Sequence, residues 1–202
     1  MQNVTSFIAA LLLAPSLALA QARVIQFRSA EDPASPPDPA VCAAAPFAAN
    51  LRIGGTLYTY ATRKRDGLVV NDDVRAIGKA TACARITNLA FPSGLQQSFY
   101  LQLTLQDGIY AANGTCTIIS NDVPQTGLVL AGCALKMTKF PEGVAGGAVT
   151  SVSTFNPFRL AGFATGSYWT AQIYDASAGP ELQQDSNRAM EWSEGGDHDA
   201  QE

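Results

Sequence analysis

The sequence predicts an all-β protein that forms a single antiparallel barrel of about eight strands. The first observation is strict alternation of apolar and polar residues, clearest in 99–106, because a period of two is typical of a half-buried strand. The second is a series of similar segments that are separated by Gly, Pro or Asn, with short connections and no convincing helical periodicity. The alternative is a two-sheet sandwich, which needs longer crossing connections; the stretches around FPSG and PEGVAGG could contain one.

The predicted strands follow one another through the middle of the chain. In order they are LRIGGTLYTYATRK (51–64), LVV (68–70), RAIGKATACARITN (75–88), QSFYLQLTLQ (97–106), IYAANGTCTIIS (109–120), TGLVLAGCALKM (126–137), GAVTSVSTF (147–155) and SYWTAQIYD (167–175). The expected architecture is similar to that of lipocalin-like and allene-oxide-cyclase-like barrels, on strand count alone. Because one fold serves many functions, this similarity implies no activity.

The first 20 residues have the form of a secretory signal peptide. An apolar run at 7–13 is followed by small residues at Ala18 and Ala20, and cleavage is expected after Ala20 or Ala22. No Lys or Arg precedes the run, which is atypical. The run is shorter than the roughly 20 residues that a spanning helix needs, so we predict a secreted protein, extracellular or periplasmic, with no membrane span in the mature chain.

Composition divides the remaining chain into three parts. Residues 21–45 contain AEDPASPPDP and are expected to form a Pro-rich extended segment. Residues 46–176 should form the barrel domain, with ten Lys or Arg against seven acidic residues. Residues 177–202 carry seven acidic residues and one Arg, and we expect a disordered acidic tail, with a short recognition segment as the alternative.

Turn chemistry predicts the register of two neighbouring hairpins. Asp107-Gly108 is typical of a tight two-residue turn, which would place Leu105 opposite Tyr110 and Phe99 opposite Cys116. Cys116 then lies on the apolar face. In the next hairpin, pairing of Ser120 with Val129 would bring Ile118 opposite Ala131 and Cys116 opposite Cys133.

The four cysteines are expected to form disulfides rather than a metal site. Directly opposed cysteines on neighbouring antiparallel strands lie at about disulfide distance, which predicts a Cys116–Cys133 bridge. A Cys42–Cys83 bridge follows by elimination, although the four residues allow three connectivities. The cysteines are dispersed without a C-x-x-C pair, and secreted chains favour disulfides, so we predict no metal and no cofactor.

Histidine-dependent catalysis is not supported by the sequence. The only histidine, His198, lies in the acidic tail, and no G-x-S-x-G motif is present. Carboxylates could still supply an acid/base pair, but most aspartates stand beside Gly, Asn or Pro, where they cap turns. Asp175 is the main exception, since it shares the parity of Trp169 along the last predicted strand.

Two groups of residues are candidates for binding. Aromatic and apolar side chains with interior parity could line a cavity for a small ligand: Phe99, Leu101, Tyr110 and Trp169. The consecutive cations Arg63, Lys64 and Arg65 could bind an anionic surface, although the sequence favours the simpler explanation of a charged hairpin tip that prevents edge pairing. Asn113 begins an N-glycosylation motif with outward parity.

Three hypotheses of function follow from these residues. The first is a secreted, disulfide-stabilised barrel that binds a small apolar or aromatic ligand. The alternatives are a histidine-independent lyase, isomerase or glycosidase that uses carboxylates or tyrosines, and an extracellular surface or matrix interaction module. No nucleic-acid partner is expected, and nothing in the sequence indicates an oligomeric state.

Overall fold

The computed structural model describes residues 22–65 and 68–176, without the side chains of 61–74. The predicted signal peptide and acidic tail lie outside these ranges. Within them, no helix has the length and apolar character that a membrane crossing requires.

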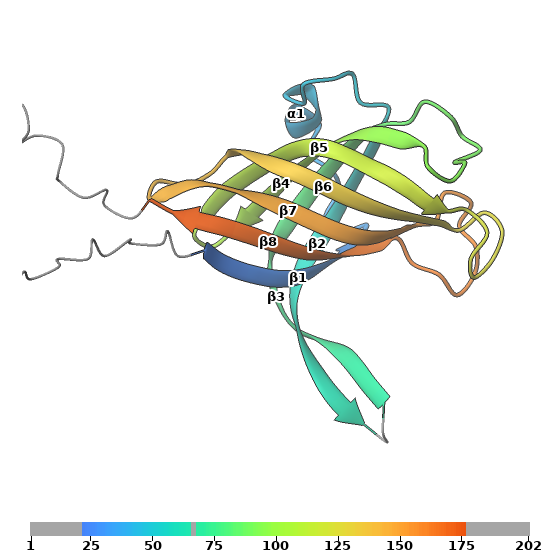
Figure 1. Ribbon diagram of the computed structural model, residues 1–202, viewed down its shortest axis with the longest axis horizontal. Helices are drawn as coiled ribbons and strands as arrows, with labels where there is room; N and C mark the ends of the chain where they lie inside the picture. The colour runs from blue at the N-terminus through green and yellow to red at the C-terminus, as the bar shows by residue number, and fades with distance from the viewer. Residues whose placement is uncertain (1–21, 66–67, 177–202) are drawn as a thin grey trace, which may run out of the picture.

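Eight antiparallel strands form one closed barrel, in which consecutive strands of the chain pair with each other and the first pairs with the last (Figure 1). The strands are β1 (Ala22–Glu31), β2 (Leu51–Arg65), β3 (Leu68–Arg85), β4 (Gln96–Leu105), β5 (Gly108–Ser120), β6 (Val129–Lys139), β7 (Val144–Phe155) and β8 (Gly166–Asp175). β1 closes the ring against β8, where Phe27 lies opposite Trp169. The predicted barrel is confirmed, and the alternative sandwich is wrong.

The strand count agrees with the prediction, but two of the strands differ. The LVV run and residues 75–88 were expected to be separate strands, yet residues 68–85 form the single strand β3. The eighth strand is β1, which lies within the segment expected to be a Pro-rich extension. β1 has the alternation of a strand, because Ile25 and Phe27 pack into the core while Gln26 between them is exposed. The barrel therefore begins at Ala22.

A short helix, α1 (Pro39–Ala43), also lies in the segment expected to be extended. Asp38 is its N-cap, and the Asp38 Oδ1 accepts a hydrogen bond from the Ala40 N–H at 2.8 Å. Pro39 stands in the first turn, where a backbone N–H has no intrahelical partner. Asp38-Pro39 is thus a helix-start signal that the high proline content of the region concealed.

Both predicted disulfides are present. Cys116 and Cys133 lie directly opposite each other on β5 and β6, with their Cα atoms 4.0 Å apart. Ser120 pairs with Leu130 rather than with Val129, because the register shifts after Ile118. The bridge between Cys42 and Cys83 joins α1 to the outer face of β3, with Cα atoms 5.5 Å apart. Two disulfides are compatible with an extracellular or otherwise oxidising environment.

The predicted β4–β5 register is wrong by two residues. Leu105 lies opposite Gly108, and Phe99 lies opposite Gly114, so the turn is centred on Gln106 and Asp107. Gly108 has φ 142°, and a Cβ there would lie 2.6 Å from the Pro141 side chain. Glycine is therefore favoured by this positive φ and by the close approach of the β6–β7 connection, although Gly108 is not a central residue of the turn. A shift of two residues preserves parity, so Cys116 still faces the interior.

β2 and β3 extend beyond the barrel as a two-stranded arm (Figure 1). β1 stops pairing with β2 at Tyr58. Beyond Tyr58, β2 pairs with β3 alone. Arg63, Lys64 and Arg65 are the last residues of β2, at the predicted hairpin tip. The structure does not describe the side chains of these three residues, so their surface-binding role stays a prediction.

Candidate ligand-binding site

The two ends of the barrel differ in their connections. We call the end with residues 32–50, 86–95, 121–128 and 156–165 the open end, and the end with turns 106–107 and 140–143 the closed end. In Figure 1 the connections 121–128 and 156–165 lie at the right, and the closed end lies at the left. The long connections thus gather around one mouth of the barrel.

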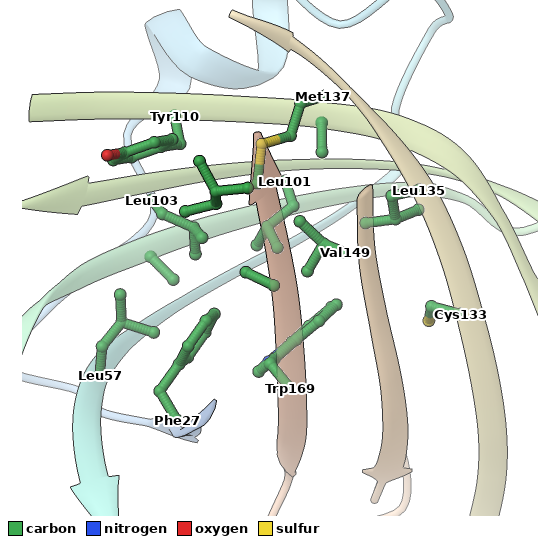
Figure 2. Close-up of a cluster of buried hydrophobic side chains, with 14 of the residues drawn as sticks. Phe27, Leu57, Leu101, Leu103, Tyr110, Cys133, Leu135, Met137, Val149 and Trp169 are labelled. Carbon is green, nitrogen blue, oxygen red and sulfur yellow. The ribbon is translucent and has the colours of Figure 1, made fainter. Parts of the chain in front are cut away.

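The closed half of the interior is filled by large side chains (Figure 2). These residues point inward from seven strands and are at most 3% exposed: Phe27, Leu57, Leu101, Leu103, Tyr110, Leu135, Met137, Val149, Trp169 and Ile173. Such close packing is what an eight-stranded barrel normally shows throughout its interior.

The open half contains a cavity of about 100 Å³. Many of the inward-facing residues there are small. They include Ala80, Ala82, Ala84, Ala131, Ser29, Ser153, Ser167 and the Cys116–Cys133 disulfide. On β1, β6, β7 and β8, large inward residues are followed by small ones toward the open end, whereas β2 and β4 keep large ones there, such as Ile53 and Phe99. The small side chains leave part of the space inside the barrel unfilled.

Trp169 forms part of the cavity wall where it meets the packed half. Its ring stacks on Phe27 with centroids 6.4 Å apart and lies 6.3 Å from Phe99 (Figure 2 shows the first pair). The indole Nε1 donates a hydrogen bond to Ser29 Oγ at 2.9 Å. Since the indole donor is satisfied by Ser29, the rest of the ring offers an apolar surface.

Hydroxyl groups form one side of the cavity, on β1, β7 and β8. Ser167 Oγ donates to Ser153 Oγ at 2.8 Å, and Ser153 Oγ lies 3.0 Å from Ser151 Oγ. Ser29 lies opposite Ser167 in the sheet. The cavity is therefore mainly apolar with one polar wall, a composition typical of sites for small organic ligands.

Phe91 narrows the mouth of the cavity. It lies on the β3–β4 connection, is 3% exposed and contacts Phe155 edge-on at 5.7 Å. Its φ is 47°, and Arg159 at the same mouth has φ 55°; they are the only non-glycine residues with positive φ among those described. Such a backbone conformation is unfavourable for a bulky residue and persists where the surroundings hold it, as they do at many binding sites.

A wider space of about 360 Å³ lies outside this mouth. It shares Glu31, Phe91 and Phe155 with the inner cavity, and Arg52 and Arg159 contribute the positive charges. Arg159 forms a salt bridge with Glu31 at 3.1 Å. Because the Arg159 side chain is exposed, this pair contributes little to stability and could open at small cost.

Gln97 is a buried amide in the cavity wall. It is 3% exposed, and its Oε1 accepts a hydrogen bond from the Thr87 N–H at 3.1 Å. Its Nε2 is buried without a hydrogen-bond partner. Gln97 was not among the predicted site residues. It has the interior parity of Phe99 and Leu101, so the alternation in the sequence already indicates that its side chain faces the interior.

Three of the four predicted ligand-binding residues line the cavity, namely Phe99, Leu101 and Trp169. Tyr110 does not, because it lies near the closed end. Its hydroxyl donates to Asp107 Oδ2 at 2.8 Å, and Arg23 forms salt bridges with Asp107 and Asp175. In Figure 2 this hydroxyl points away from the other labelled side chains. Tyr110 and its charged neighbours therefore cap the closed end, and Asp175 belongs to this cap.

The phenol of Tyr110 should make stability depend on alkaline pH. Burial raises the pKa of Tyr110 above its ordinary value of about 10, and the hydrogen bond to Asp107 adds to this shift. A raised folded-state pKa contributes stability that is complete below about pH 10 and is lost as pH rises through the folded pKa. Urea denaturation at pH 8 and 11 should show Tyr110→Phe losing less stability over this range than the wild type.

The exposed Tyr168 provides the control for this prediction. Tyr168→Phe should keep the wild-type pH dependence, since no buried phenol is removed. At pH 8, Tyr110→Phe should be less stable by about 1 kcal/mol because the hydrogen bond to Asp107 is lost. An unchanged pH profile in Tyr110→Phe would contradict the assignment.

The remaining predicted residues lie away from the cavity. Asn113 is half-buried on the outer face of β5, between Tyr100 and Lys136 in the sheet, and its glycosylation stays a prediction. Asp122 accepts a hydrogen bond from Ser120 Oγ at 2.7 Å and shapes the β5–β6 connection, as turn chemistry predicts.

The part of the chain that the structure describes contains no group of three or more His, Cys, Asp or Glu side chains suited to a metal ion. Comparison of the chain with protein-family models, with curated proteins and with solved structures finds no match.

Proposed function

We propose that this protein binds a small, mainly apolar ligand in the open half of the barrel, and that it does so as a secreted protein. The ligand would be about the size of one aromatic ring or a short acyl chain, since a cavity of roughly 150 Å³ accommodates benzene. The inner cavity is slightly smaller than this, so part of the ligand would reach toward Phe91 and the wider space outside.

The division of the interior into a packed half and a hollow half is the observation that carries this proposal. Side chains that line a cavity have fewer packing contacts than those of a filled core, which lowers the free energy of unfolding. Larger residues at Ala82, Ala84 or Ala131 would recover part of this free energy, as Leu101 and Leu135 do deeper in the barrel. The small residues that line the open half, on β1, β3, β6, β7 and β8, are thus better explained by a ligand than by stability.

The cavities favour binding over the predicted acid/base chemistry. The inner cavity, the space outside the mouth and a neighbouring polar pocket of about 200 Å³ are together lined by one acidic residue, Glu31, and by no tyrosine. General acid/base catalysis by carboxylates or phenols needs two convergent groups. The charged groups that do converge, Arg23, Asp107 and Asp175, lie at the closed end.

Filling the cavity should abolish binding without unfolding the protein. Ala82 faces the cavity and lies opposite Leu101 and Ile53 on the neighbouring strands. Ala82→Leu should place its side chain in the empty space, weaken the binding of toluene at least tenfold and leave stability unchanged or raised. Titration of the ¹⁵N-labelled protein with toluene, followed by the indole N–H signal of Trp169, measures the affinity.

A matched control comes from the outer face of the barrel. Ala134 on β6 is exposed, so Ala134→Leu should bind toluene as the wild type does. Absence of saturable toluene binding to the wild type, or equal binding in both variants, would refute the proposal.

A further inference from the structure

The amide of Gln97 is held in one orientation. A backbone N–H can only donate, so the side-chain atom that faces the Thr87 N–H at 3.1 Å must be the oxygen. Thr87 Oγ1, at 3.5 Å, lies beside the same oxygen. The NH₂ group is therefore directed away from Thr87 and cannot exchange places with the oxygen without breaking the contact that positions it.

An unpartnered buried amide is unusual in this protein. Asn156 is similarly buried, and its Nδ2 donates to the carbonyls of Leu160 and Phe163, both at 2.9 Å, while its Oδ1 accepts from the Leu160 N–H at 2.8 Å. Among the described residues, the other buried side-chain atom without a partner is Thr59 Oγ1, which lines none of the three cavities. Gln97 is among the residues that line the cavity, and its Nε2 is a buried, unused donor whose lack of a partner carries a desolvation cost.

We infer that the ligand is a neutral carbonyl compound whose oxygen accepts a hydrogen bond from Gln97 Nε2. This inference rests on the proposed function and specifies its ligand. Gln97 lies opposite Cys116, nearer the open end of β4 than Phe99 and Leu101. The carbonyl therefore lies near the mouth, and the apolar part of the ligand lies against Phe99 and Trp169.

The charge of the cavity favours a neutral ligand over a carboxylate. Glu31 is the charged residue in the lining of the inner cavity, and its negative charge would repel an anion. Arg159 pairs with Glu31, and Arg52 lines the space outside the mouth and not the inner cavity. A ketone, aldehyde, ester or amide can accept the hydrogen bond of Gln97 without burying an ionic charge.

Two probes of the same shape separate recognition of the carbonyl from recognition of the apolar ring. Acetophenone carries a C=O group where α-methylstyrene carries C=CH₂. Titration of the ¹⁵N-labelled full chain with each probe, followed by the Gln97 side-chain NH₂ and the Trp169 indole N–H, gives two values of Kd. The quantity of interest is their ratio, because it cancels the apolar contribution that the probes share.

Gln97→Met removes the donor and keeps the approximate volume of the side chain. We expect it to weaken acetophenone binding roughly tenfold and to leave α-methylstyrene binding unchanged, so that the ratio of the two Kd values shifts roughly tenfold. Gln96→Met is the matched control, since Gln96 is the adjacent, exposed residue of the same strand, and it should preserve the ratio.

A second variant guards against a folding defect. Gln97→Glu keeps an oxygen for the Thr87 N–H while replacing the donor, and at pH 8 it should shift the ratio in the same direction as Gln97→Met. If both probes bind the wild type and neither Gln97 variant changes the ratio, the carbonyl inference is wrong while the proposed function stands. If neither probe binds saturably to the wild type, the proposed function and the inference are both wrong.

Discussion

Replacing Trp169 by alanine is expected to lower the free energy of unfolding by about 3 to 5 kcal/mol, the range for removing a large aromatic side chain from a core. The indole is 2% exposed, stacks against Phe27 and lies beside Phe99. It also supplies the hydrogen bond to Ser29 Oγ. Trp169 belongs to the packed half and to the cavity wall at once, so its removal should both weaken the barrel and deepen the cavity.

Denaturation by urea, followed by circular dichroism, measures this effect. Trp169→Phe is the informative intermediate, because it keeps a ring against Phe27 and removes the hydrogen bond to Ser29, and it should cost clearly less than Trp169→Ala. A loss below about 1 kcal/mol in Trp169→Ala would contradict the assignment, since the surroundings of a buried tryptophan that contacts Phe27 and Phe99 cannot collapse that completely.

The second large effect is expected from removing the Cys42–Cys83 disulfide. The two cysteines are 41 residues apart in sequence, and cross-linking a loop of that length stabilises the folded state by about 4 kcal/mol in the chain-entropy description. The Cys116–Cys133 bridge spans 17 residues, for which the same relation gives about 3 kcal/mol. The double variant Cys42→Ala/Cys83→Ala should therefore be the less stable of the two alanine pairs.

Removal of each disulfide should also have a different effect on the contact between α1 and the barrel. Val41, Tyr100 and Ala111 are buried between α1 and the outer wall of β3–β5, and the Cys42–Cys83 bridge holds that contact together. Hydrogen exchange in residues 38–50 should accelerate when this bridge is removed and stay unchanged when Cys116 and Cys133 are replaced. Similar stability losses with no change in exchange near α1 would show that the helix is held by apolar contacts alone.

Much of the fold was predictable because strand signals are local. Alternation with period two assigns the faces of a strand whatever its partners are, so the inward positions of Phe99, Leu101 and Trp169 were correct. The same parity placed Cys116 on the inner face, since an error of two residues in the preceding hairpin leaves every side chain on its proper face. Its position opposite Cys133 was predicted from a pairing of Ser120 with Val129, and it is correct although Ser120 itself pairs with Leu130. The first strand was not predicted, although Ile25 and Phe27 flank the polar Gln26. The prolines that follow it led to the prediction of an extended segment for the whole of residues 21–45.

The sequence by itself determined the all-β class and the inner face of most strands, and it predicted the Cys116–Cys133 disulfide, since all of these depend on parity within short segments. The Cys42–Cys83 disulfide followed only by elimination among three connectivities. Only the tertiary structure decided that β1 closes the ring and that one half of the interior is hollow. A cavity is a difference between the space enclosed by eight strands and the volumes of the side chains that share each layer, so it depends on register across the whole barrel. Register also decided that Gln97, and not Phe99, lies opposite Cys116, which places an amide donor in the cavity wall.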